Sequence, residues 1–169
     1  MHPLVRLAKE TVELYVREKD VREVREEEFD PEFREPAGVF VCLKIAGMLR
    51  GCIGTFQPTE SSIVRETVRN AISAATCDPR FACVRPGELS SLEYTVDVLT
   101  SPEQVKDRAD LDPKRYGVIV QSAGRRGLLL PDLEGVDTVD EQIGIAMQKA
   151  GIPRESAVTL FRFEVKRYH

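Results

Sequence analysis

The sequence has 169 residues, of which 42% are hydrophobic and 31% charged, and its 28 acidic and 24 basic side chains give a net charge of −4. This length suits one domain, 1–169, or two lobes that share a core. The charge balance excludes a protein that binds nucleic acid through a global basic excess. No apolar run reaches the ~18–20 residues that span a bilayer, and the N-terminus lacks a signal-peptide core, so a cytoplasmic protein is expected.

The first third of the chain predicts a helix, a connector and a strand. Apolar residues recur at three- and four-residue spacing over 3–25, which predicts an amphipathic helix. The acidic stretch 24–36 lacks any periodicity and contains two prolines, which is typical of a connector. A dense β-branched run over 38–46 predicts a strand, and a short turn at Gly47 and Met48 leads it into an antiparallel partner or a bulge.

The middle of the chain predicts a second helix and another strand. An apolar stripe over 61–77 predicts the helix, with Ser61 or Ser62 as its N-cap. Pro79 cannot continue that helix and so ends it. Strict alternation of apolar and polar residues over 92–98 predicts a half-buried strand.

The last third predicts a hairpin, a third helix and a closing strand. Two short apolar runs, 117–121 and 127–131, flank a turn. The capping-box spacing of Thr138–Glu141 precedes a helical stripe over 139–150, and alternation over 161–165 predicts the last strand. Because about three helices are separated by groups of strands, the expected class is α+β with mainly antiparallel sheet.

The residues that several common catalytic, metal-binding and nucleotide-binding sites require are missing from the sequence. The two histidines, His2 and His169, stand at opposite ends of the chain, so a Cys–His or Ser–His–Asp site would need a folded-in terminus. Zinc-binding spacings, a Walker motif and GxGxxG are all missing. No metal or cofactor is therefore expected, and the residues leave open whether the protein is an enzyme.

The cysteines are expected to be reduced. A chain of this size without a signal peptide favours free thiols over two disulfides. The four cysteines are Cys42, Cys52, Cys77 and Cys83.

One of these cysteines lies in a compact cluster of functional residue types. Arg50 and nearby backbone amides would favour the thiolate of Cys52, and Gly51 and Gly54 could let successive N–H groups converge on an anion. Thr55 adds a hydroxyl. The alternative is a glycine-rich bulge that packs two strands, with the cysteine as a small apolar side chain.

Two further clusters carry charge. Asp78 could act as a general base and Arg80 could bind a carboxylate or phosphate, or the two could form an internal pair in a helix-ending turn with Phe81 as anchor. Arg125 and Arg126 sit at the predicted hairpin tip, where they could meet phosphate or simply be solvated.

Six segments stand out together, and in chain order they are LRGCIGTF at 49–56, DPRF at 78–81, YTVDVLTSPE at 94–103, YGVIV at 116–120, GLLLP at 127–131 and FRFEVKRY at 161–168. They resemble the AMMECR-type domain family, whose bacterial and archaeal members are called AmmeMemoRadiSam system protein A. The resemblance runs over nearly the whole chain, and LRGCIG is its most specific motif.

The resemblance implies a compact α+β protein with a larger and a smaller lobe and with the motif near a groove. Prokaryotic members are associated with a Memo-type protein, which resembles metal-dependent extradiol dioxygenases, and with a radical-SAM enzyme. It also implies a role in a modification pathway, with RNA bases as one substrate class. The residues matching the family motif are Leu49 to Gly54.

Three hypotheses follow for the function. The first is a binding module that holds an anionic substrate, RNA or a nucleotide, in a groove beside the motif. Its substrate-binding residues would be Arg50, Gly51, Gly54, Thr55 and Arg80. The second is an enzyme with Cys52 as catalytic nucleophile, assisted by Asp78, and the third is a non-catalytic interaction or scaffold domain.

Overall fold

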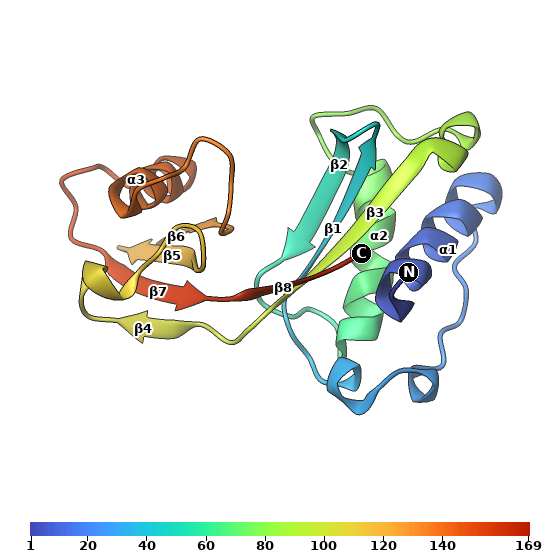
Figure 1. Cartoon of the computed structure of the whole chain (residues 1–169), viewed down its shortest axis with the longest axis horizontal. Coiled ribbons are helices and arrows are strands. Elements are labelled where there is room, and N and C mark those ends of the chain that lie inside the picture. Colours follow the sequence, from blue (N-terminus) through green and yellow to red (C-terminus); the bar gives the residue numbers. More distant parts are fainter. The chain divides into compact units, whose positions relative to one another are not determined.

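The computed structural model describes all 169 residues, which form two compact units. The larger unit comprises Met1–Leu99 and Lys166–His169, and the smaller unit comprises Thr100–Val165. Each has its own antiparallel sheet (Figure 1). Each sheet has four strands, and each unit has its own hydrophobic core. The predicted α+β class, with three main helices and a larger and a smaller lobe, is confirmed. That 1–169 is a single domain stays a prediction.

The larger unit combines two helices with a sheet of strand order β2-β1-β3-β8. Its main elements are α1 (Pro3–Glu18), β1 (Val39–Ile45), β2 (Met48–Thr55), α2 (Ile63–Thr76), β3 (Leu92–Leu99) and β8 (Val165–Tyr168). The connector after α1 contains the short 3-10 helices Glu26–Glu28 and Pro31–Arg34, and a third, Pro86–Ser91, precedes β3. No helix of the protein is both long and apolar enough to cross a membrane.

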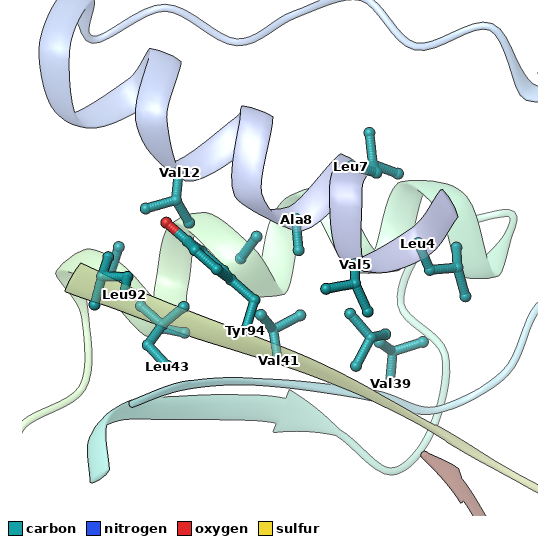
Figure 2. Packing of buried hydrophobic residues seen from close by; sticks show 14 of the residues in the cluster. Leu4, Val5, Leu7, Ala8, Val12, Val39, Val41, Leu43, Leu92 and Tyr94 are labelled. Carbon is teal, nitrogen blue, oxygen red and sulfur yellow. The ribbon is translucent and has the colours of Figure 1, made fainter. Parts of the chain in front are cut away.

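Both helices of this unit pack on one face of the sheet. Val39, Val41 and Leu43 alternate along β1 toward α1 and α2 and are fully buried (Figure 2). Because strand side chains alternate between faces, Phe40 and Cys42 point the other way. We call that second face, opposite α1 and α2, the outer face.

The β1–β2 hairpin turns one residue earlier than the sequence predicts. Ala46 and Gly47 both have positive φ, 50° and 76°, as a two-residue type I′ turn requires. Met48 is therefore the first residue of β2 rather than part of the turn. The predicted antiparallel pairing is confirmed, with a bulge between Leu43 and Lys44.

The predicted end of the first helix at residue 25 is wrong. The helix stops at Glu18 because Lys19 adopts the left-handed conformation, with φ 59°, and its N–H bonds the carbonyl of Tyr15. The second helix is confirmed, and Ser62 is its N-cap.

The smaller unit packs one helix on a sheet of strand order β4-β7-β5-β6. Its main elements are β4 (Glu103–Val105), β5 (Gly117–Ser122), β6 (Arg125–Leu129), α3 (Val139–Ala150) and β7 (Thr159–Phe163). The predicted hairpin and the Thr138–Glu141 capping box are confirmed. The prediction of a single closing strand is wrong, because Glu164 separates β7 from β8 and the two strands belong to different sheets.

The two histidines meet at the chain ends. The N–H of His2 donates to the carbonyl of His169 at 3.0 Å, and its ring stacks on Tyr168. Nδ1 of His2 accepts the N–H of Leu4 and so caps α1. Burial, followed by the charge of Lys166, lowers the pKa of His2, which favours the neutral ring that can accept this hydrogen bond.

Candidate functional site

The LRGCIG and DPRF segments meet along the outer edge of β2. The N–H of Cys52 donates to Oδ2 of Asp78 at 2.9 Å, and Nη2 of Arg80 donates to the carbonyl of Cys52 at 3.4 Å. β2 is the first strand of its sheet, so these two side chains bond backbone groups that a further strand would otherwise pair. The structure thus brings three of the predicted site residues together.

Asp78 is held as a buried carboxylate. Its side chain is 2% exposed, and its oxygens accept Nε, Nη2 and the backbone N–H of Arg80 as well as the N–H of Cys52. The hydrogen bonds from Arg80 outweigh burial and hold the pKa of Asp78 far below its usual range. Asp78 as a general base stays a prediction, and this geometry disfavours it because so acidic a group is a poor proton acceptor at neutral pH.

Arg50 bonds the protein's own loop. Its Nε and Nη2 donate to the carboxylate of Glu88 at 2.8 and 3.1 Å, and Nη1 donates to the carbonyl of Ala82 at 2.9 Å. The pair with Glu88 raises the pKa of Arg50, whose side chain is only 17% exposed. Arg50 therefore fastens the loop that follows α2 onto β2, and its role in ligand binding stays a prediction.

The expectation of four free thiols is wrong for two of them. Cys42 and Cys52 are directly opposite each other on β1 and β2, on the outer face, and form a disulfide. The two positions are nearly equidistant from the hairpin turn, which is the sequence signal that could have indicated the pairing. Cys77 and Cys83 are free, as predicted, and both are exposed.

The two motif glycines lie in regular strand and not in a left-handed conformation. A Cβ at Gly51 would lie 2.2 Å from the carbonyl oxygen of Ala74, so this glycine lets α2 approach β2 closely. A Cβ at Gly54 would lie 2.2 Å from the ring of Phe40. Both positions are explained by packing, and their amides as an anion site stay a prediction.

Thr55 belongs to a separate network at the other end of β2. Its hydroxyl donates to Oε1 of Glu66 at 2.6 Å and accepts Nδ2 of Asn70 at 3.2 Å. Glu66 is fully buried on α2 and also accepts the backbone N–H groups of Thr59 and Glu60. Burial alone would raise the pKa of Glu66, but these hydrogen bonds outweigh it and lower the pKa.

Sequence reasoning missed Glu66 and Glu88. A glutamate three residues after Ile63, within the apolar stripe of a helix, was the available signal for Glu66. Glu88 had no such signal, because its partner Arg50 lies 38 residues away in the sequence.

A surface cavity lies elsewhere in the larger unit. It has a volume of about 680 Å³ and is lined by α1 and the connector, with Arg6, Leu7, Glu10, Arg25 and Phe29 among its residues. A groove beside the motif therefore stays a prediction. No group of three or more His, Cys, Asp or Glu residues is placed to hold a metal ion.

Comparison with known proteins identifies the family. A protein from Thermotoga maritima is 52% identical over 169 residues, which is 99% of this chain and 97% of that protein. A protein from Clostridium acetobutylicum is 46% identical over 98% of this chain, which spans only 36% of that longer protein. The crystal structure of an uncharacterized protein from Pyrococcus horikoshii, 32% identical, matches with a TM-score of 0.87 over 97% of this chain and 88% of that one. The AMMECR1 family model matches residues 5–168, so the chain belongs to the AMMECR1 family, as its motifs predict.

Proposed function

We propose that the chain is a binding module that holds an anionic ligand, RNA or a nucleotide, beside the LRGCIG segment and presents it to partner enzymes. One observation carries the proposal: the groups suited to chemistry are bonded within the protein, whereas Arg80 is held firmly and stays 55% exposed. Cys52 is in a disulfide and Asp78 is saturated with hydrogen bonds.

The orientation of Arg80 suits anion recognition. Nε and Nη2 of its guanidinium are fixed by Asp78, which leaves Nη1 for a ligand. The ring of Phe81 lies beside the guanidinium, 5.5 Å from its central carbon. A cation whose rotamer is already fixed loses less entropy on binding than a mobile lysine or arginine would.

The test is calorimetric titration of the protein with pyrophosphate, ADP and a single-stranded RNA hexanucleotide. Arg80→Gln should weaken the binding of whichever ligand binds by about tenfold to a hundredfold, the range for a charged hydrogen bond. Arg65→Gln is the matched control, because Arg65 is also 55% exposed and loses the same charge. Equal weakening in both variants, or no binding of any of the three ligands, would contradict the proposal.

The same titration addresses the alternative that Cys52 is a catalytic nucleophile. That role needs the Cys42–Cys52 disulfide to be reduced first, because the bonded sulfur is no thiolate. A binding module predicts that Cys52→Ser binds the ligand as the wild type does. A covalent adduct at Cys52 in the reduced protein would favour the enzyme instead.

We further propose that a Memo-type protein and a radical-SAM enzyme are the partners, as the family resemblance implies. The Clostridium relative supports a domain that works beside others, since most of its length lies outside the matching segment. The expected result is co-elution of this chain with at least one of the two proteins from the same organism in size-exclusion chromatography at micromolar concentration. Separate elution of all three would contradict it.

A further inference from the structure

A second arginine on the larger sheet is built like Arg80. Asp97 on β3 has a side chain that is 1% exposed, and its two oxygens accept Nε and Nη2 of Arg167 on β8, both at 2.8 Å. The side chain of Arg167 is 43% exposed. Each of the two arginines is thus fixed by a buried aspartate and still reaches solvent.

The pairs Asp78–Arg80 and Asp97–Arg167 lie at opposite edges of the sheet. Tyr94 and Val96 are buried toward the helices, so Asp97 points to the outer face by alternation along β3. Arg80 lies at the edge of β2, the first strand of the sheet, and Arg167 is on β8, the last. Three strand spacings of about 4.8 Å separate these strands, a span of roughly 14 Å.

Phe40 lies between the two arginines on this face. Its cross-strand neighbours are Gly54 on β2 and Asp97 on β3, and its ring covers the place where Gly54 lacks a side chain. The ring is partly exposed. Phe40 and the Asp97–Arg167 pair therefore lie at one level of the sheet, and Arg80 lies two residues along β2, at Cys52.

From this arrangement we infer that the anionic ligand of the proposed function is a single-stranded RNA that crosses the outer face. Phosphates contact Arg80 and Arg167, and a base stacks on Phe40, as bases do on aromatic residues of other sheets. At about 3.4 Å per phosphate, the spacing along one strand of a double helix, a span of roughly 14 Å takes about four nucleotides, and a more extended strand needs fewer. This inference rests on the proposed function and adds the ligand class, its length and two further residues.

The experiment measures fluorescence anisotropy of labelled RNA of one, two, four and eight nucleotides. Affinity is expected to rise up to about four nucleotides and then to level off. Phe40→Leu should weaken binding of the four-nucleotide RNA by about tenfold, whereas Phe40→Tyr keeps a stacking ring and should bind as the wild type does.

The second arginine has a matched control beside it. Arg167→Gln should weaken binding and reduce the slope of log affinity against log salt by about 0.7, the amount for one phosphate of a single strand. Lys166→Gln removes the same charge from the neighbouring residue, which contacts Glu32, and should leave the slope unchanged. Melting temperatures of all variants report whether each one is folded.

The outcomes separate this inference from the proposed function. Length-independent binding that needs Arg80 but not Phe40 or Arg167 overturns the inference and leaves the proposed function standing. Binding that ignores Arg80 overturns both. A phosphorylated peptide that binds as tightly as the RNA, with the same dependence on Phe40 and Arg167, also overturns the choice of RNA.

Discussion

Replacing Gly51 by alanine is expected to lower the free energy of unfolding by about 3 kcal/mol, at the upper end of the usual cost of overpacking a core. The added Cβ would lie 2.2 Å from the carbonyl oxygen of Ala74, which is helix backbone and cannot rotate away. Helix α2 would have to move off β2, which would disturb the packing of Ala74 and Leu43. In a chain of this length the melting temperature should fall by about 6–12 °C.

Two other glycines provide the comparison. The Cβ added in Gly87→Ala would lie within 4 Å of no other atom, so this variant should have an unchanged or slightly raised melting temperature. Gly127→Ala should cost as much as Gly51→Ala, since its Cβ would lie 2.0 Å from the carbonyl oxygen of Ala146 on α3. If Gly51→Ala unfolds at the same temperature as Gly87→Ala, close packing does not explain the glycine in the motif.

The packing role of Gly51 changes how the motif is understood. Part of LRGCIG serves to join β2 to α2, and Arg50 joins β2 to the loop that follows α2. Those residues position the surface on which Arg80 lies without having to touch a ligand themselves. A rigid support beneath an exposed cation is what a binding module needs.

Elements whose signals are local were predicted well. The helix over 139–150 was predicted with the bounds it has, because its capping box and Gly151 specify both ends within the helix itself. The end of α1 was missed because the apolar spacing continues past Lys19, whose left-handed conformation has no sequence signature. The break between β7 and β8 depends on the two sheets that the strands join, and alternation alone does not report that.

The sequence indicated which residues belong to the candidate site better than it indicated what each of them does. The sequence suggested that Asp78 and Arg80 could form an internal pair, and the structure has that pair. It did not suggest that the pair bonds the backbone of Cys52, which lies 26 residues from Asp78 in the sequence. The partner of a polar side chain at such separation is set by the folded sheet, so spacing along the chain cannot specify it.

Replacing Glu66 by glutamine should lower the free energy of unfolding by about 3 kcal/mol, since each hydrogen bond to a charged group contributes roughly 1.5–3 kcal/mol. The carboxylate is fully buried and accepts four hydrogen bonds, two of them from backbone N–H groups that share Oε2. A glutamine side chain in the same place has one NH2 group, which is a donor. If that group points at the backbone N–H groups of Thr59 and Glu60, donors face donors. If it points the other way, the hydroxyls of Thr55 and Thr59 must reorient. The measurement is urea unfolding at pH 7, compared with the wild type.

The pH dependence and a matched control complete the test of Glu66. Its pKa is lowered in the folded protein, so its stabilisation is full above its ordinary pKa of 4.5 and is lost as the pH falls below that value. The difference between wild type and Glu66→Gln should therefore shrink when unfolding is measured below about pH 4. Glu141→Gln makes the same change where the carboxylate also accepts two backbone N–H groups but is exposed, and it should destabilise much less. Equal losses for the two variants would mean that burial of the Glu66 charge adds nothing, and that the loop joining β2 to α2 is held by other contacts.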